Sequence, residues 1–225
     1  MDGNGRWAQE KGKPRVAGHK KGGKTVERIA LDGVDLGIES LTLYSFSSEN
    51  WKRPQGEIKE LMKLYRHYLI GIRPMMMKNK VKLVHLGKLD NLPETLITEL
   101  NKSIEMTAEN DGMILGLALN YGARQEIVDA VQSIASECKQ GTLDPEQIDE
   151  ECISSRMYAP QVGDPDLLIR TASEMRVSNF LLWQISYSEF FVTDTYWPDF
   201  NKANMEEAII AYANRNRRFG SLKTK

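Results

Sequence analysis

The sequence predicts a single α/β domain with a largely parallel central sheet flanked by helices. Short apolar runs rich in β-branched and aromatic residues alternate with longer amphipathic segments, an order typical of βαβ units and parallel sheets. The chain has 225 residues, of which 41% are hydrophobic and 27% charged. That composition suits a globular protein with a buried core. Because no internal repeat, low-complexity stretch or linker interrupts it, we expect residues 1–225 to form one domain.

The first half of the chain predicts two strands and two helices. Residues 41–46 form the first expected strand, and the polar segment 47–56 follows it as a loop. Apolar residues then recur at helical spacing, which predicts one long helix over 57–77. A strand over 81–87 and a helix over 92–110 continue the alternation.

The second half repeats the pattern. Residues 113–122 predict a buried strand, and 124–141 predict an amphipathic helix. Two more strands, over 166–171 and from Glu189 onward, surround a helix that is expected to begin near Ser178, whose hydroxyl would cap it. Ligands of such sheets bind beyond the carboxyl ends of the strands. We therefore expect the polar segments that follow the strands to carry the functional site.

Charge and cysteine content exclude several classes of protein. The 30 basic and 31 acidic residues give a net charge of -1, which argues against a general nucleic-acid binder. Cys138 and Cys152 have no CxxC spacing, so two reduced thiols in a reducing compartment are expected.

The sequence also predicts no membrane span. Its longest apolar run of this kind, over 113–119, is far shorter than the roughly 18 residues that a span requires. With no signal-peptide pattern at the start, a cytoplasmic location is expected.

The N-terminal segment is locally basic and rich in glycine. In MDGNGRW, the glycines allow close approach of the backbone to a ligand and let amide N–H groups cradle an anion. Arg6, Arg15 and His19 could complete a diphosphate site. Asp2 beside such a site is expected to meet a cation, and Mg²⁺ commonly accompanies diphosphates. The alternative is a glycine turn followed by a solvated basic helix.

Two further polar clusters follow expected strands. Residues 45–54 gather small hydroxyls, an amide, an indole and two cations, although Asn50 could also serve a turn. In residues 167–180, two arginines and the expected helix N-terminus would bind a second phosphate group. Glu189, further on, could be a surface acid or a metal ligand.

Taken in order, these motifs resemble one family. MDGNGRWA, GHKKG, LYSFSSENWKRP, NYGAR, DLLIRT, SNFLLWQ, YSEFFVTD and WPDF are similar to motifs of the cis-prenyltransferases, which include the bacterial undecaprenyl diphosphate synthases. The resemblance runs from Met1 to about Arg218. It implies condensation of isopentenyl diphosphate onto an allylic diphosphate, with farnesyl diphosphate as the expected primer and Mg²⁺ as cofactor. The implied product is a long-chain polyprenyl diphosphate such as undecaprenyl diphosphate, the lipid carrier for peptidoglycan synthesis.

The resemblance also assigns roles by matching positions. Asp2 is implied to be the essential acid that engages Mg²⁺ and diphosphate, with Glu189 as a further metal ligand. Asn50 matches the residue assigned as proton acceptor, but an amide is a poor base, so we expect it to orient the substrate. The implied substrate-binding residues are Gly3, Asn4, Gly5, Arg6, Trp7, Arg15 and His19 for the allylic diphosphate, Ser47, Ser48, Glu49, Trp51 and Arg53 beside the reacting carbons, and Arg170, Arg176, Val177 and Ser178 for isopentenyl diphosphate.

Assembly and product handling are implied as well. Members of the family are homodimers, and Arg218 and Gly220 resemble a C-terminal motif that reaches the neighbouring subunit's site. The growing chain requires an apolar tunnel, for which helix 57–77 and strand 113–119 are the expected walls. Met113 matches the floor of that tunnel, so Met113→Ala is expected to lengthen the products. The product is expected to pass to the membrane, where the enzyme would be peripheral.

The sequence departs from the family in a few places. Ala172 and Ser173 stand where most members have glycines, and Met175 stands where some have a metal-binding histidine. Extra bulk at the first two positions is expected to reshape the turn beside Arg176. A glycine-rich loop normally follows a strand, so a first strand upstream of Met1 is expected; the alternative is a sheet without that edge.

Two rival functions are considered. One is a cis-prenyltransferase with short or medium-length products, because the sequence does not fix the tunnel volume. The other is a non-catalytic partner subunit, which is disfavoured because Asp2, Asn50 and Arg170 are retained. Trans-type synthases are disfavoured because the chain has no Asp–Asp pair for a DDxxD motif.

Overall fold

The strands of this protein form two parallel sheets. The computed structural model describes residues 1–215. Within that part, β1 (Ser40–Ser47), β2 (Lys82–Leu86) and β3 (Ile114–Tyr121) form a sheet in the order β1-β3-β2. The other sheet pairs β4 (Leu167–Arg170) with β5 (Glu189–Val192). The predicted class, α/β with parallel strands, is confirmed, with the strands divided between two sheets.

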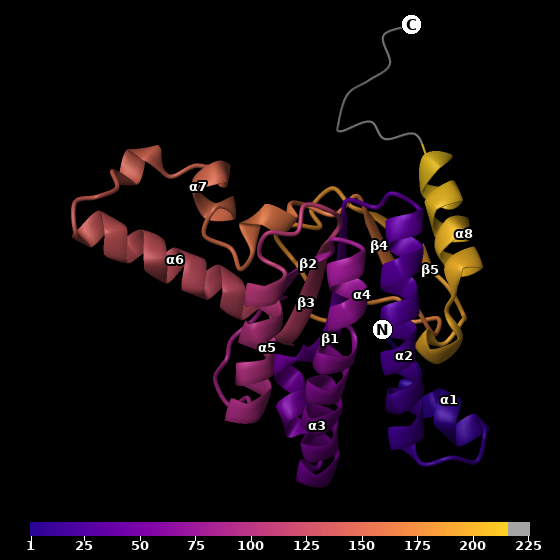
Figure 1. Cartoon of the computed structure of the whole chain (residues 1–225). Helices are drawn as coiled ribbons and strands as arrows, with labels where there is room; N and C mark the ends of the chain where they lie inside the picture. Colours follow the sequence, from indigo (N-terminus) through magenta and orange to yellow (C-terminus); the bar gives the residue numbers. More distant parts are fainter. Residues whose placement is uncertain (216–225) are drawn as a thin grey trace, which may run out of the picture.

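Helices flank these sheets on both sides, as Figure 1 shows. Two long helices, α2 (Arg15–Asp35) and α3 (Gln55–Gly71), lie beside each other, and α6 with α7 projects away from the strands. None of the helices in residues 1–215 combines the length and hydrophobicity needed to cross a bilayer. The remaining α-helices are α1 (Asn4–Glu10), α4 (Arg73–Lys78), α5 (Glu94–Met106), α6 (Ala123–Lys139), α7 (Glu150–Ser154) and α8 (Lys202–Ala213), and the 3-10 helices are η1 (Ser48–Lys52), η2 (Pro145–Gln147), η3 (Pro160–Val162) and η4 (Trp197–Asp199).

The expected single helix over 57–77 is wrong, because the chain forms α3 and α4 instead. Pro74 lies in the first turn of α4. Proline has no N–H to donate to the carbonyl four residues earlier, and its ring crowds that carbonyl. Proline fits the first turn of a helix, where the N–H would lack a partner in any case. A new helix therefore starts at Arg73.

The helix expected to begin near Ser178 is also absent from the described chain. Turns connect β4 to β5 instead. Ser178, Asn179 and Leu181 have φ values of 55°, 59° and 47°, and the left-handed region cannot continue a right-handed helix. Ser178 is consequently not an N-cap. Its hydroxyl oxygen instead accepts a hydrogen bond from Arg170 Nη1 at 3.2 Å.

The core lies on both faces of the three-stranded sheet. One buried cluster joins β1, β2 and β3 to α2, α3, α4 and α5, with Phe46, Leu69 and Leu115 among its members. A second cluster, which includes Tyr121 and Leu168, packs on the other side. Burying each large apolar side chain contributes about 1.5–3 kcal/mol to folding. Coverage of both faces is typical of parallel sheets.

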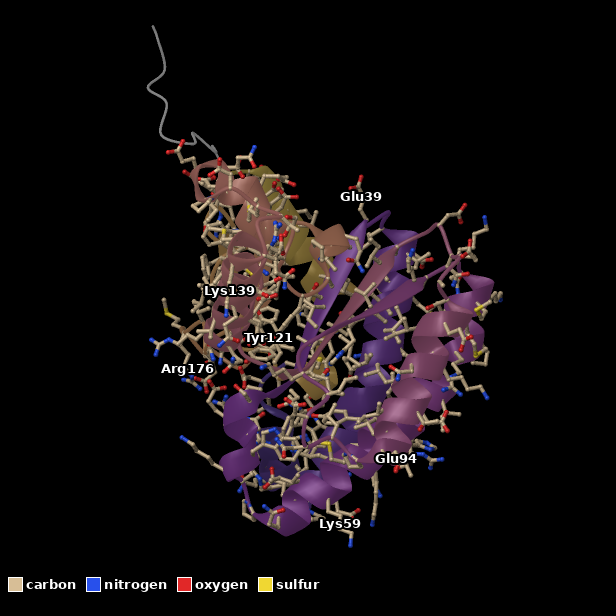
Figure 2. All side chains as sticks on the ribbon, turned by 90° about the vertical axis from the view of Figure 1, so that its left-hand side faces the viewer. Glu39, Lys59, Glu94, Tyr121, Lys139 and Arg176 are labelled. Atoms are coloured by element: carbon tan, nitrogen blue, oxygen red, sulfur yellow. The ribbon has the colours of Figure 1, made fainter. Side chains whose placement is uncertain are left out.

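The carboxyl ends of the strands gather the polar segments at one end of the molecule. Figure 2 shows Glu39, which precedes β1, at the opposite end of the sheet from Tyr121, which ends β3. Arg176 lies at the same end as Tyr121. This is the end at which the sequence analysis predicts the site.

Candidate active site

A cavity of about 600 Å³ opens beyond the carboxyl ends of β1 and β4. All eight residues of β1, an edge strand of its sheet, and all four residues of β4 line it, so the cavity extends along both strands. Its volume lies within the range of ordinary ligand pockets, about 300–1,000 Å³. One end of the cavity is polar and is called the mouth; Asp2, Arg6, Arg15, His19, Arg53, Arg170 and Arg176 line it. The apolar part between α2, α3 and the sheet is called the channel.

Most of the predicted site residues meet in this cavity. Those that line it are Asp2, Gly3, Asn4, Gly5, Arg6, Arg15, His19, Ser47, Asn50, Arg53, Arg170, Arg176, Val177 and Ser178. Those that do not are Trp7, Ser48, Glu49, Trp51 and Glu189. Arg218 and Gly220 lie outside the described residues.

Asp2 and Arg170 form an ion pair at the end of β4. Arg170 Nε donates to Asp2 Oδ2 at 2.8 Å, and Arg170 Nη2 lies 2.8 Å from the same oxygen. The backbone of Asp2 is fixed independently: its N–H donates to Thr171 Oγ1 at 2.8 Å, and its carbonyl accepts from the Thr171 hydroxyl and from the Trp197 N–H, both at 2.9 Å. The carboxylate is thus held beside the arginine by contacts that do not involve its own oxygens.

Glu174, which the sequence analysis missed, joins two more arginines. Its Oε1 accepts from Arg6 Nη2 at 2.6 Å, and its Oε2 accepts from Arg176 Nη1. The Arg6 guanidinium also lies 5.5 Å from the centre of the Tyr196 ring, within cation–π range. The Arg176 carbonyl in turn accepts from Arg170. These contacts bring Arg6, Arg170 and Arg176 together at the mouth.

Glu57 organises a second group of basic residues. Its Oε1 accepts from Arg53 Nη1 at 3.0 Å and lies 3.9 Å from both Arg15 Nη2 and His19 Nε2. Arg15 can lie against α1 because Gly5 has no Cβ: one built there would be 2.8 Å from Arg15 Cζ. Glu57 was missed because an acid near the start of a helix is a common capping feature with no functional signal of its own.

His19 is held as a neutral donor. Burial lowers its pKa to about 4, and the neighbouring Arg53 acts in the same direction, against the weaker attraction of Glu57. Its Nε2 is buried and has no hydrogen-bond partner among the described residues. A neutral imidazole can donate one hydrogen bond from such a nitrogen. His19 is therefore suited to donate to an anion in the cavity.

Asn50 both shapes a turn and lines the cavity. Ser47 and Asn50 form a capping box on η1, in which the Ser47 N–H donates to Asn50 Oδ1 at 3.2 Å and the Ser47 hydroxyl accepts from the Asn50 N–H. The turn role considered in the sequence analysis is thus present without excluding a role at the site. With its Oδ1 engaged, the amide is suited to donate to a substrate oxygen.

Two predicted indoles support the site from outside. Trp7 Nε1 donates to Asp199 Oδ2 at 2.7 Å, which ties α1 to η4. Trp51 Nε1 donates to Asn120 Oδ1 at 2.7 Å, which ties η1 to the end of β3. The other predicted residues of η1 outside the lining are Ser48 and Glu49, the latter accepting from Asn179 Nδ2 at 2.7 Å.

Glu189 lies away from Asp2. It begins β5 opposite Leu167, whereas Arg170 lies opposite Val192, a separation of about 10 Å along the strands. Its Oε2 accepts from Arg215 Nη1 at 2.5 Å. Within residues 1–215, no group of three or more histidine, cysteine or acidic side chains could hold a metal. A metal-binding role for Glu189 stays a prediction.

The turn after β4 explains why glycine would be favoured at two positions. Ala172 and Ser173 have φ values of 67° and 55°, in the region that glycine adopts most easily. Their N–H groups donate to the carbonyls of Thr195, at 3.0 Å, and Thr193, at 2.9 Å. The turn thus accommodates both side chains at a cost in backbone strain.

The apolar part of the cavity follows one face of each long helix. Side chains at helical spacing line it, and Leu83, Leu115 and Leu117 contribute from the sheet. Met113 is not among the lining residues: it is buried against Gly33, where an added Cβ would lie 3.1 Å from its Sδ. The structure therefore supports α3 as a wall but does not place Met113 at the floor. Apart from Arg15 and His19 at the mouth, the lining residues of the two helices are Gly22, Gly23, Val26 and Ile29 from α2, and Leu61, Leu64, Tyr65, Tyr68 and Leu69 from α3.

Comparisons with known proteins agree with this geometry. Residues 1–220 match the family model described as "Putative undecaprenyl diphosphate synthase". The isoprenyl transferase of Shouchella clausii is 49% identical over 222 residues, which cover 99% of this chain and 86% of that protein. That of Bacillus subtilis is 46% identical over 222 residues, covering 99% and 85%.

A solved structure is also similar. The lavandulyl diphosphate synthase from Lavandula x intermedia, in complex with dimethylallyl diphosphate, aligns with a TM-score of 0.94 and 33% identity, covering 98% of this chain and 95% of that one. Family, relatives and fold agree over nearly the whole length. The chain belongs to the undecaprenyl diphosphate synthase family of cis-prenyltransferases, and it is an enzyme that transfers prenyl groups.

Proposed function

We propose that this enzyme condenses isopentenyl diphosphate onto farnesyl diphosphate and repeats the step to give a long-chain product such as undecaprenyl diphosphate. One observation carries the proposal: two groups of basic side chains at a polar mouth lead into an apolar channel. Two diphosphate substrates require two anion sites held in fixed relation. Arg170 and Arg176 supply one site, and Arg15, His19 and Arg53 supply the other.

The residues at the mouth suit the chemistry of condensation. The allylic C–O bond breaks, a C–C bond forms with the isopentenyl double bond, and a proton leaves the new chain. Arginines at the leaving diphosphate stabilise its developing charge, and neutral His19 can donate to one of its oxygens. Asn50 orients the substrate, while a diphosphate oxygen or the Asp2 carboxylate accepts the proton.

We also propose that Asp2 holds a magnesium ion at the mouth. Asp2 lines the cavity, and its side chain is 39% exposed beside Arg170. Mg²⁺ is commonly held by one or two carboxylates together with substrate phosphate oxygens and water. Asp2 would hold it in this way, and the ion would neutralise diphosphate charge during departure.

We further propose a homodimer that works in the cytoplasm and hands its product to the membrane as the carrier for peptidoglycan precursors. The side chains of Phe190 and Val192, on one face of β5, and of Ile210, on α8, are apolar and exposed, so a second copy could cover them.

A shorter product is the second candidate. The similarity to lavandulyl diphosphate synthase, solved with dimethylallyl diphosphate, favours it. A non-catalytic partner subunit is disfavoured, because Asp2, Arg170 and Arg176 all meet in the cavity.

The test is incorporation of radiolabelled isopentenyl diphosphate with farnesyl diphosphate and Mg²⁺, with products separated by chain length. We expect a product near the undecaprenyl standard. Short products would replace the main proposal with the second candidate. No incorporation above a chelator control would contradict both.

A further inference from the structure

Helices α2 and α3 pack side by side, and the line of contact between them, called the seam, forms one wall of the apolar channel. Near the mouth, Glu57 of α3 faces Arg15 and His19 of α2, at 3.9 Å from each, and these polar side chains occupy the seam. Two turns further along α2, Gly23 lines the cavity and faces α3. At this position α2 has no side chain with which to close the seam.

The ring of Tyr68 fills this position from the other helix. A Cβ built on Gly23 would lie 2.0 Å from Tyr68 Cε2 and 2.2 Å from its Cζ, so the ring rests directly on the backbone of α2. The Tyr68 hydroxyl donates to the Lys20 carbonyl on the same helix. The ring lines the cavity on one side and is half-buried. Tyr68 thus lies in the wall between the channel and solvent at this level.

The position along the channel matters for the product. Gly23 lies eight residues beyond Arg15, about 12 Å along the helix axis. The channel is only part of a cavity of about 600 Å³, a volume that suits a drug-sized ligand. A polyprenyl chain of undecaprenyl length is much larger, so continued growth requires a wall that yields.

We propose that Tyr68 is a specificity-determining residue, whose ring closes the α2–α3 seam and limits the length to which the chain grows before release. The inference rests on the proposed function, because it assumes that the prenyl chain grows along this channel. The ring is held by packing on a glycine and by one hydrogen bond, so it can be removed without opening the buried core. Removing it lets the chain pass between the helices instead of stopping in the channel.

The adjacent residue supplies a matched control. His67 lies next to Tyr68 on α3, its ring 5.6 Å from the Tyr68 ring, but it is exposed and does not line the cavity. Tyr68→Phe keeps the ring and removes only the hydroxyl. Tyr68→Ala removes the wall.

The experiment compares product lengths of the wild type, Tyr68→Ala, Tyr68→Phe and His67→Ala under identical conditions. We expect Tyr68→Ala to raise the fraction of products longer than the main wild-type species at least threefold. The other two variants should keep the wild-type fraction, because neither removes the Tyr68 ring from the channel wall. An unchanged or shorter distribution in Tyr68→Ala, with labelled isopentenyl diphosphate still incorporated, overturns the inference. Loss of incorporation in the wild type would instead contradict the proposed function.

A double-mutant cycle tests the contact without any assay of activity. Gly23→Ala should lower the melting temperature of the wild type, because its methyl group overlaps the ring. In the Tyr68→Ala background it should leave the melting temperature unchanged or raise it, since alanine is the better helix former. Equal effects in both backgrounds would show that the ring does not rest on Gly23 and would overturn the inference. If Tyr68→Ala fails to fold, Tyr68→Leu replaces it in both experiments.

Discussion

The polar mouth and the apolar channel of this cavity are built in different ways. At the mouth, residues 168 positions apart in sequence, Asp2 and Arg170, make a direct ion pair, and most charged side chains have one partner of opposite charge. The channel is lined by side chains that recur at helical spacing along α2 and α3. A single substitution can therefore remove a function at the mouth, whereas in the channel it changes a shape. We expect mouth variants to alter rate and channel variants to alter product length.

The largest effect is expected at Asp2. Asp2→Asn keeps the size of the side chain but removes the charge that pairs with Arg170 and would hold Mg²⁺. Loss of one such electrostatic group commonly lowers kcat about 10²–10³-fold. Steady-state incorporation of isopentenyl diphosphate measures it.

Asp199→Asn is the matched control for this change. Asp199 also accepts a hydrogen bond from a side chain, that of Trp7, but it lies outside the cavity lining. Its variant should stay within about threefold of the wild-type rate, a loss typical of a single hydrogen bond. Equal losses in the two variants would mean that stability, rather than the charge at the mouth, explains the result.

His19 makes the stability of the protein depend on pH on the acid side of neutrality. Its pKa falls from an ordinary 6.5 to about 4 on folding. Between these values the unfolded chain binds the extra proton, so the free energy of unfolding decreases as the pH falls from 6.5 towards 4. At about 1.4 kcal/mol per pKa unit, the loss reaches at most ~3.5 kcal/mol.

Urea unfolding at several pH values tests this expectation. His19→Gln should flatten the decrease, whereas His67→Gln, on the exposed face of α3, should preserve it. A wild-type slope in the His19 variant would show that other groups carry the acid sensitivity.

The smallest effect is expected in the turn that supports the mouth. Ala172→Gly and Ser173→Gly remove side chains from left-handed positions, where non-glycine residues cost roughly 1–2 kcal/mol. Part of that gain is lost to the greater freedom of glycine in the unfolded chain, so each change should stabilise by about 0.5–1 kcal/mol.

Alanine to glycine in a helix should have the opposite effect on the free energy of unfolding. Ala211→Gly in α8 is expected to destabilise by about 1 kcal/mol. Denaturant midpoints measure all three variants. Destabilisation by Ala172→Gly would mean that the buried methyl group contributes more through packing than the backbone loses through strain.

Elements with regular apolar spacing were predictable from the sequence, and breaks within that spacing were not. The five strands and the helices α5 and α6 were predicted, because the periodicity of apolar residues reports directly on which face of an element is buried. The break before Pro74 was missed because the apolar spacing continues through it. The helix near Ser178 was wrong because Ser178, Asn179 and Leu181 adopt left-handed conformations that local preference does not indicate.

The sequence by itself determined the class of fold, the family and most residues of the mouth, since the ordered motifs carry their own chemistry. Only the tertiary structure showed that Glu57 and Glu174 hold the basic residues in two groups, that Glu189 lies at the far end of β5, and that the Tyr68 ring rests on Gly23. These are contacts between segments distant in the chain. They depend on how helices and strands pack, which no local pattern of residues specifies.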